Sequence, residues 1–390
     1  MPSPDASAME RSRVLTTLIR EEIENAPRSM IPFQRFMELA LYEPGLGYYQ
    51  SDAPKFGGEG DFITAPEISR LFSRCVARQI GEVLTGLGGG DVIEVGAGSG
   101  IMALDIIREL CAQPNAEGCP PRKYLILERS RALRRLQQAT IRTHAPSLFG
   151  RFQWLDDLPE VGFRGVIFAN ELLDAMPIRR FLMEDGAVRE WMVGWSEGKF
   201  TWRMVPAQPA LEKAVRHIEN SLEEPLFDGY ASELHLAQAA WVEGAARCLG
   251  AGLLLLFDYG YPRAEYYHPE RCSGTLTCHY RHRLHDDPFF LPGLQDISAH
   301  VDFSTIAEAG TQTLELAGFT TQRDFLIATG LPDMCAEMDS ASLEYMVLAQ
   351  EIKQLLLPGE MGDIVKAMGF TRGMEEELRG FDGFDLRGRL

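Results

Sequence analysis

The most constraining feature of this sequence is an apolar run that leads directly into closely spaced glycines. Residues 91–95 (DVIEV) have the composition of a buried strand, and Gly96, Gly98 and Gly100 follow in the spacing G-x-G-x-G. Glycine is needed where the backbone adopts positive φ or where a ligand lies directly on it. A strand that enters a glycine turn and then a helix is typical of nucleotide-binding α/β folds. The sequence therefore predicts a ligand site at the end of this strand.

Two phosphate-binding patterns do not fit this loop. The dinucleotide pattern G-x-G-x-x-G would need a glycine where Ile101 stands, and a P-loop would need a lysine that is absent. The form G-x-G-x-G preceded by Glu94 resembles the first motif of Rossmann-like methyltransferases. In that family the acidic strand end faces the cationic amino-acid half of S-adenosylmethionine (SAM). The resemblance implies that Glu94 and the glycines Gly96, Gly98 and Gly100 bind this cofactor.

Acidic residues also follow the next two predicted strands. Glu128 ends the strand 123–127, and a carboxylate at this position can accept hydrogen bonds from both ribose hydroxyls. Asp156 follows the strand 152–155, where this fold usually contacts adenine, although a helix N-cap or a turn residue is an equal alternative. Both residues are predicted to bind the cofactor.

Strands and helices alternate through the first half of the chain. Strands are expected at 91–95, 124–127, 152–155 and 165–169, with helices after the first two. This order predicts an α/β fold, a mostly parallel doubly wound sheet with helices on both faces. The alternation then stops, because residues 178–205 have the pattern of a three-stranded antiparallel meander with turns at Asp185-Gly186 and Glu197-Gly198.

The remaining pattern divides the chain into four expected parts. Helices are predicted at 208–221 and 232–249, a strand at 252–257, a helix at 303–317, a strand at 319–328 and a helix at 333–357. The parts are a helical N-terminal extension with a long loop (1–60), a cofactor-binding α/β core (61–177), a β-meander and helical insertion (178–250), and the remainder of the core (251–390).

The segment after the fourth strand is the predicted catalytic centre. Asn170, Glu171 and Asp174 follow this strand at its carboxyl end, where open α/β sheets bind ligands. Glu171 and Asp174 are three residues apart, so on a helical turn their carboxylates would share one face. We hypothesise that they hold and polarise an acceptor nitrogen. The alternative is a helical first turn in which the helix dipole favours acids.

Two further segments each have a functional and a structural interpretation. Thr64 and Glu67 could form a capping box at a helix start. Asp296, His300 and Asp302 could line an acceptor channel with His300 as the proton acceptor, or could cap the helix that begins near residue 303. Three histidines lie nearby, but their spacing matches zinc sites poorly, so no metal is predicted; these are His279, His282 and His285.

Composition narrows the choice of partner and compartment. The net charge of −18 argues against nucleic acid and favours a small molecule or a cationic protein segment. No apolar run approaches the roughly 20 residues that span a bilayer, so no membrane insertion is predicted. The seven cysteines include no Cys-x-x-Cys pair, which favours reduced thiols in a cytoplasm.

Several segments together resemble the MidA-like methyltransferases, whose mitochondrial members are complex I assembly factors that methylate an arginine of a complex I subunit. These segments are IPFQRFMELALYEPGLGYY, GDFITAPEISRLF, DVIEVGAGSG, YLILERS, FANELLDAMPIRRF, LLLFDYGYPRAEYYHPERCSGTL, YRHRLHDDPFFLPGLQDISAHVDF and LLLPGEMGDIVKAMGF. The resemblance implies a Rossmann-like class I methyltransferase with a seven-stranded sheet that ends in an antiparallel hairpin. It implies that Thr64 and Pro66 border the cofactor pocket.

The resemblance also implies an activity and a partner. The activity is methylation of an arginine in a protein, for which a respiratory complex I subunit is one candidate. Two alternatives remain open: a SAM-binding assembly factor with little catalysis, and a small-molecule methyltransferase. A homodimer also remains open.

Overall fold

The computed structural model describes residues 1–53, 55, 60–61, 63–112, 120–336 and 343–390. Part of the long loop expected before residue 60 therefore lies outside the described residues. The chain divides into two compact units, and each is built from three separate stretches. The first unit contains residues 1–62, 173–239 and 261–305, and the second contains 63–172, 240–260 and 306–390.

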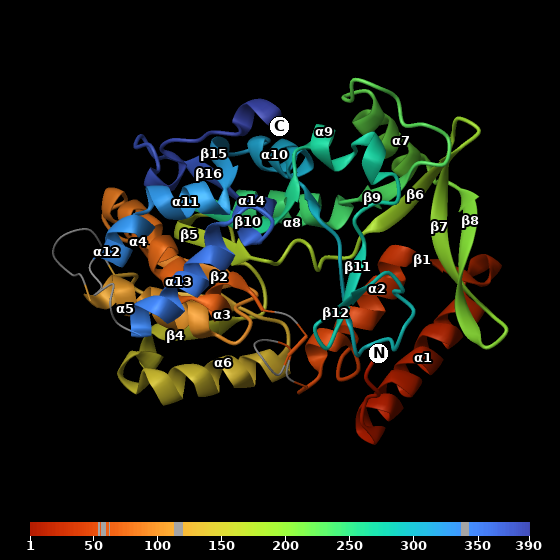
Figure 1. The fold of residues 1–390 in the computed structure, drawn as a ribbon, viewed down its shortest axis with the longest axis horizontal. Coiled ribbons are helices and arrows are strands. Elements are labelled where there is room, and N and C mark those ends of the chain that lie inside the picture. Colours follow the sequence, from red (N-terminus) through yellow and green to blue (C-terminus); the bar gives the residue numbers. More distant parts are fainter. Residues whose placement is uncertain (54, 56–59, 62, 113–119, 337–342) are drawn as a thin grey trace. The chain divides into compact units, whose positions relative to one another are not determined.

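A central β-sheet forms the second unit (Figure 1). Seven strands lie in the order β15-β16-β10-β5-β2-β3-β4. The pairs among β10, β5, β2, β3 and β4 are parallel, whereas β16 is antiparallel to both β10 and β15. The bounds are β2 Asp91–Val95, β3 Tyr124–Leu127, β4 Phe152–Leu155, β5 Phe163–Asn170, β10 Leu249–Tyr261, β15 Glu315–Thr321 and β16 Val365–Arg372. The predicted α/β fold class and the antiparallel final hairpin are confirmed.

Helices lie on both faces of this sheet (Figure 1). Their bounds are α3 Ala65–Ile68, α4 Arg70–Gly86, α5 Ile101–Ala112, α6 Arg131–His144, α8 Leu236–Cys248, α10 Phe303–Thr311, α11 Gln322–Ala328, α12 Leu331–Ala336, α13 Leu343–Leu356 and α14 Met361–Ile364. A parallel sheet covered on both faces needs strands that are apolar throughout. The run Leu253–Leu256 is such a sequence, and all four side chains are buried.

The C-terminal third differs from the sequence-based expectation. The predicted strand 319–328 is in fact a strand that ends at Thr321 and a helix that begins at Gln322, because Thr321 caps that helix through Asp324 N–H (3.1 Å). The predicted helix 333–357 contains two helices, α12 and α13. β16 is not predicted from the residue pattern. At Gly369 in this strand, the ring of Phe381 occupies the space that a side chain would need.

The first unit is built around an antiparallel sheet. Its order is β1-β7-β6-β9, and β8 pairs with β7. The predicted meander is present, and both of its turns have positive φ at Asp185-Gly186 and Glu197-Gly198, as two-residue hairpins require. The strands are β1 Met30–Pro32, β6 Arg179–Glu184, β7 Ala187–Ser196, β8 Lys199–Pro206 and β9 Ala231–Leu234. β9 lies where the sequence predicts the start of the helix 232–249, which begins only at Leu236.

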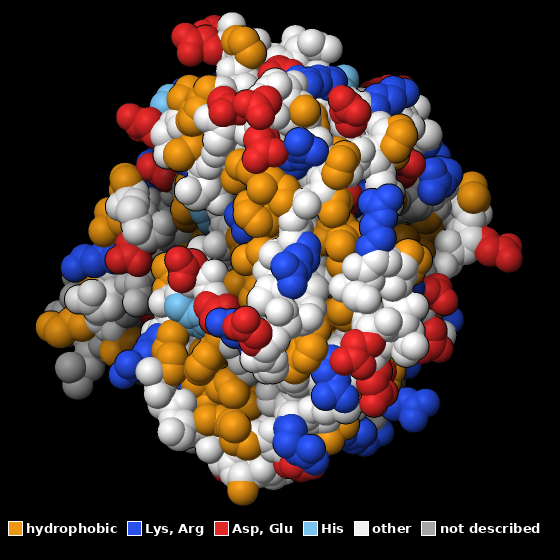
Figure 2. All heavy atoms as spheres, turned by 90° about the vertical axis from the view of Figure 1, so that its right-hand side faces the viewer, with side chains coloured by type: hydrophobic (Ala, Val, Ile, Leu, Met, Phe, Trp, Pro, Cys, Tyr) orange, Lys and Arg blue, Asp and Glu red, His pale blue; other side chains and the backbone are white. Residues whose placement is uncertain are grey.

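Helices and a small second sheet complete the first unit. The helices α1 Ala6–Asn25 and α2 Phe33–Tyr42 share an apolar cluster with β7 and β8, and α7 Pro209–Glu219 packs on β6 and β9. The face that carries β7 and β8 shows hydrophobic side chains between charged side chains of both signs (Figure 2). The second sheet has the order β12-β11-β13, with β11 Thr277–Tyr280, β12 Arg283–His285 and β13 Asp296–Ser298. None of the described helices has the length and apolar character needed to cross a bilayer.

Two glycines fix how closely the central strands of the second unit approach. Gly165 in β5 has φ +142°, and a Cβ atom there would lie 1.9 Å from the carbonyl oxygen of Asp91. Gly252 in β10 has φ +128°, and its Cβ atom would lie 1.9 Å from the carbonyl oxygen of Gly165. The pairs Asp91–Gly165 and Gly165–Gly252 are also strand partners. Only glycine fits at these two positions, so the strand register depends on them.

We predict that Gly165→Ala lowers the free energy of unfolding by at least about 2 kcal/mol, because the new methyl group overlaps a neighbouring backbone and the φ angle disfavours a side chain. Gly244→Ala is the matched control: Gly244 lies inside α8, and its Cβ atom would contact nothing within 4 Å. Alanine there should raise stability by about 0.5–1 kcal/mol. Urea denaturation followed by circular dichroism measures both changes. Equal stability of Gly165→Ala and the wild type would contradict the packing argument.

Candidate functional site

Polar side chains collect at the carboxyl ends of the parallel strands in the second unit. Glu94 lies near the end of β2, Glu128 follows β3, Asp156 follows β4 and Glu171 follows β5. Asp258 lies near the end of β10 and was not identified from the sequence. Carboxyl ends of parallel strands share one edge of a sheet, which is where open α/β sheets bind ligands.

The glycine loop between β2 and α5 adopts a conformation that requires glycine. Gly96, Gly98 and Gly100 have φ angles of 72°, 52° and 82°. A Cβ atom at Gly96 would lie 3.0 Å from Leu172 Cδ1, and one at Gly100 would lie 3.1 Å from the backbone of Gln137. At Gly96 and Gly100 the loop therefore packs tightly against two other segments of this unit, and a side chain there would force a neighbour to shift.

Glu94 is a buried acid that accepts a hydrogen bond from a tyrosine of the next strand. Its side chain is 3% exposed and accepts a hydrogen bond of 2.6 Å from the hydroxyl of Tyr124. Burial raises the pKa of Glu94 from 4.5 to about 7, although the Tyr124 hydrogen bond acts in the opposite direction. A cationic ligand group next to this carboxylate would compensate the cost of burying its charge.

Glu128 belongs to a buried hydrogen-bond network that the sequence analysis missed. Its carboxylate accepts hydrogen bonds from Ser130 N–H (2.8 Å) and from Gln137 Nε2 (3.1 Å). Gln137 also donates to the Gly98 carbonyl (3.1 Å) and accepts from Trp154 Nε1 (2.9 Å). Burial raises the pKa of Glu128, and these donors oppose that effect. Gln137 thus connects the acid after β3 to the glycine loop; no sequence pattern distinguishes it from other helix residues.

Asp156 lies in a different environment from the other acids. Its side chain is 88% exposed and forms an ion pair of 2.7 Å with Arg134 of α6. Asp156 lies in a bend after β4, and no helix starts there. The interpretation of Asp156 as a helix N-cap is therefore wrong, and its interpretation as a turn residue fits.

The segment around α3 contacts both the glycine loop and the acid after β5. Thr64 precedes α3, but its side chain makes no capping hydrogen bond, and Glu67 accepts a hydrogen bond from the hydroxyl of Ser99 in the glycine loop. The predicted capping box is therefore wrong. Ala65 N–H donates to Glu171 Oε1 at 3.3 Å. Pro66, at the second position of α3, is buried.

Glu171 does not lie on a helix. It forms a bend with φ +49°, and the segment through Asp174 has no helical turn, so the argument that both carboxylates share a helix face is wrong. The Glu171 carboxylate is held by hydrogen bonds: Oε1 accepts from Ala65 N–H and from Asn170 Nδ2 (3.1 Å). Leu172 N–H donates to Asp258 Oδ2 (3.1 Å).

The other predicted catalytic residues belong to the first unit. Asp174 accepts a backbone hydrogen bond from Ala299 N–H (3.0 Å), and the ring of His300 packs on that of Tyr261 with centroids 5.4 Å apart. Asp302 accepts from Ser304 N–H (3.0 Å) at the start of α10, as the structural alternative expected. Asp296 is buried beside Tyr49 (2.9 Å), and burial raises its pKa from 3.8 to about 6.

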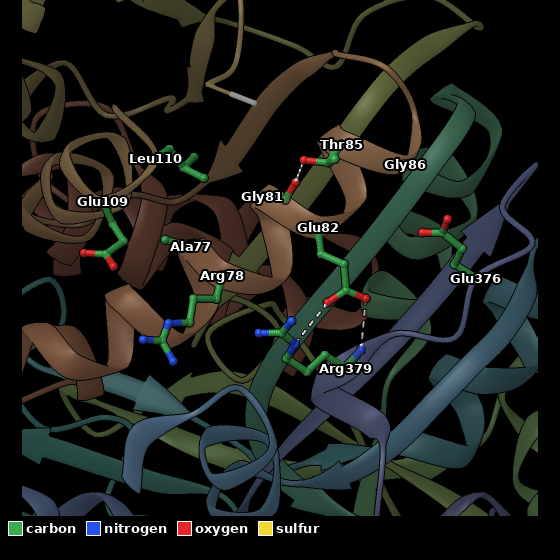
Figure 3. Close-up of a pocket in the computed structure, with 10 residues that line it drawn as sticks. All are labelled: Ala77, Arg78, Gly81, Glu82, Thr85, Gly86, Glu109, Leu110, Glu376 and Arg379. Carbon is green, nitrogen blue, oxygen red and sulfur yellow. Dashed lines mark hydrogen bonds and ion pairs between the residues drawn. The ribbon is translucent and has the colours of Figure 1, made fainter. Parts of the chain in front are cut away.

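A hollow of about 420 Å³ lies elsewhere in the second unit, between α4, α5 and the C-terminal segment (Figure 3). Several of its charged side chains already have partners, because Glu82 contacts Arg379 (3.7 Å) and Arg78 donates to the carbonyl of Thr329 (3.2 Å). None of the residues predicted to bind the cofactor lines it. We therefore do not assign the hollow to the functional site.

Comparisons with known proteins identify the family. The sequence model of a family described as S-adenosyl-L-methionine-dependent methyltransferase matches residues 75–320, well over half of the chain. The chain belongs to this methyltransferase family. A Burkholderia thailandensis protein whose crystal structure contains bound S-adenosyl-homocysteine has a TM-score of 0.93 and 39% identity, with 100% of both chains covered. The predicted family resemblance and the SAM cofactor are thereby confirmed.

Members with curated names are more distant. The protein arginine methyltransferase NDUFAF7 of Danio rerio is 26% identical over 399 residues, which cover 93% of this chain and 87% of the fish protein. Its Drosophila melanogaster homologue is 26% identical over 303 residues. That match covers 71% of this chain and 65% of the fly protein, so the chain spans just under two thirds of the latter. Both relatives are described as mitochondrial.

We predict a pH-dependent stability that originates at Glu94. A folded-state pKa of about 7 against an ordinary 4.5 means that the folded protein binds the proton more tightly. The stabilisation is complete below about pH 4.5 and is lost as the pH rises through about 7. The difference between the two pKa values corresponds to a change of about 3 kcal/mol in the free energy of unfolding. In the ligand-free protein, Glu94→Gln should therefore become more stable relative to the wild type between pH 5 and pH 8.

Melting temperatures of both proteins across this pH range measure the effect. Glu160→Gln, at an exposed position of the same unit, serves as the control. Parallel profiles for wild type and Glu94→Gln would show that the buried carboxylate does not titrate as described.

Proposed function

We propose that this methyltransferase acts on the guanidinium group of an arginine in a protein. The observation that carries the proposal is the fixed carboxylate of Glu171, which lies at the ligand-binding edge of the sheet and is joined through α3 to the glycine loop. The net charge of −18 favours a cationic acceptor. The curated relatives, at 26% identity, are named as protein arginine methyltransferases.

We assign cofactor binding to the residues at the ends of β2, β3 and β4. Glu94 would face the cationic amino-acid half, and Glu128 would accept hydrogen bonds from the ribose hydroxyls. Gly96, Gly98 and Gly100 let the ligand lie against the backbone. Thr64, Pro66 and Asp156 complete the proposed set, with Asp156 beside the adenine. The buried carboxylates of Glu94 and Glu128 fit a ligand that carries a positive charge and hydroxyl donors.

The proposed reaction makes two demands on the protein. The bound cofactor supplies a methyl group on a positively charged sulfur, and the bonding electrons return to sulfur when that group leaves. The acceptor nitrogen must be aligned with the methyl carbon, and it must lose a proton as the new N–C bond forms. Carboxylates suit both demands, because they bind a guanidinium in its plane and can accept a proton.

Glu171 is the proposed group for both demands, and Asn170 orients it. The Asn170 Nδ2 donates to Glu171 Oε1, which fixes the plane of the carboxylate before an acceptor binds. Asp174 is proposed as a second carboxylate for the guanidinium, and His300 as an alternative proton acceptor. Both follow from the sequence hypothesis, and variants at each position test them separately.

We predict that Gln137→Leu weakens the binding of S-adenosylhomocysteine by about tenfold, because the buried Glu128 carboxylate and the partly buried Gly98 carbonyl each lose a donor. Gln79→Leu is the matched control: Gln79 is also fully buried in a helix of this unit, and its amide oxygen accepts from Gly380 N–H (2.7 Å). Isothermal titration measures both affinities. An unchanged affinity in Gln137→Leu would show that the hydrogen-bond network of Gln137 does not contribute to cofactor binding.

We predict that Glu171→Gln lowers kcat for arginine methylation by about 100-fold or more, because the amide cannot accept the proton. Its affinity for S-adenosylhomocysteine should stay within about threefold of the wild type, since the change preserves shape. Asp157→Asn, an exposed acid of the same unit paired with Arg129 (2.9 Å), should leave both values unchanged.

The activity assay uses peptide pools and mass spectrometry of methylated arginines. Asp174→Asn and His300→Gln are measured beside Glu171→Gln. Wild-type protein that binds S-adenosylhomocysteine but methylates no arginine in these pools would argue for a different acceptor or a non-catalytic role. Full activity in Glu171→Gln would remove this residue from the mechanism.

A further inference from the structure

The backbone conformation of Glu171 is unusual for its place in the fold. Among the other non-glycine residues with positive φ, Asp185 and Glu197 lie in two hairpin turns, and Arg281 with His282 in a third. The remaining three in the described part of the chain lie in a short 3-10 segment (Arg28 and Ser29) and in a bend (Leu291). Glu171, with φ +49°, instead directly follows the last residue of β5, a central strand of the parallel sheet. Such a conformation persists only where the surrounding structure holds it, and it is frequent at functional sites.

Two backbone N–H groups that donate to β10 hold this bend. Asn170 is the last strand partner of Phe257, and Glu171 N–H then donates to the Phe257 carbonyl at 2.9 Å. The next N–H group, that of Leu172, donates at 3.1 Å to the side chain of Asp258, the residue after Phe257. The Asp258 carboxylate thus accepts the first N–H group after the last ladder hydrogen bond, at the point where the chain leaves the sheet.

The Asp258 carboxylate, which accepts the Leu172 N–H, is itself held in place. Its side chain has no exposed surface, and its second oxygen, Oδ1, accepts from Tyr259 N–H at 2.9 Å. Each oxygen therefore receives one backbone N–H, from two different segments. An asparagine at this position would place an NH₂ group opposite one of these donors, because its amide has only one acceptor oxygen.

We propose that Asp258 is a positioning residue for Glu171: it holds the bend after β5 by accepting the Leu172 N–H, and thereby sets the direction of the Glu171 carboxylate. The inference rests on the proposed role of Glu171 in methyl transfer. Catalytic groups need their geometry fixed to within a fraction of an ångström, and buried hydrogen bonds from outside the reacting centre supply this.

The first test compares Asp258→Asn with Asp91→Asn in the full chain. Asp91 provides a matched control, because its Oδ1 also accepts a backbone N–H from another segment, that of Lys123 (3.0 Å), but at the opposite end of β2. Asp258→Asn should lower kcat at least tenfold while KM for the peptide and the affinity for S-adenosylhomocysteine change less than threefold. Asp91→Asn should change none of the three by more than twofold.

The second test asks whether Asp258 acts through Glu171. The double variant Glu171→Gln/Asp258→Asn should have the same kcat as Glu171→Gln alone. Once residue 171 carries no carboxylate, losing the group that positions it should have no further effect on kcat. If the two substitutions each lower kcat by a factor and these factors multiply in the double variant, the proposal is wrong. An unchanged kcat in Asp258→Asn would also overturn it.

A third measurement does not depend on activity or on the folding of a variant. Amide hydrogen exchange of the wild type should show Leu172 N–H protected as strongly as Ile167 N–H inside β5. Rapid exchange at Leu172 would contradict the hydrogen bond to Asp258. If the wild type methylates no arginine while Leu172 is protected, the proposed function fails and the structural part of this inference stands.

Discussion

The register of the parallel sheet is the constraint on which the functional site depends. Gly165 and Gly252 place β2, β5 and β10 in one alignment, because any side chain there would overlap a neighbouring backbone. In that alignment Val95 pairs with Ala169, and Asn170 pairs with Phe257. The glycine loop, the Glu171 bend and Asp258 therefore emerge at matching levels of three adjacent strands. A shift by one residue would reverse the direction of every side chain along a strand and separate these groups.

Burial of acidic side chains is the energetic cost of this arrangement. Glu94, Glu128 and Asp258 are each less than 10% exposed, and the chain as a whole carries 18 excess negative charges. Hydrogen bonds from hydroxyl, amide and backbone groups offset part of the cost. A cofactor with a positive charge and hydroxyl donors would offset more if it binds at Glu94 and Glu128 as proposed, and its binding would then raise folding stability.

The sequence predicted the features that depend on local chemistry. The glycine loop, the apolar strands and the hairpin turns at Asp185 and Glu197 follow from backbone preferences and side-chain periodicity, and the whole-chain resemblance supplied the family. It did not predict contacts between distant segments. Glu67 has the spacing of a capping box, yet its partner is Ser99, and Gln137 and Asp258 become recognisable only when the sheet brings their partners together. The prediction of a helical turn at Glu171 was wrong, because tertiary hydrogen bonds to β10 determine the bend at this residue.

The order of the strands has a consequence for how the chain assembles during synthesis. β5 ends at residue 170, but its neighbour β10 begins at residue 249, after the insertion that forms part of the first unit. At roughly 5–20 residues per second, translation of the intervening segment takes about 4–16 s. Throughout this interval one edge of an apolar strand has no partner. The nascent protein therefore exposes an aggregation-prone strand edge on the ribosome, a period in which chaperones can bind it.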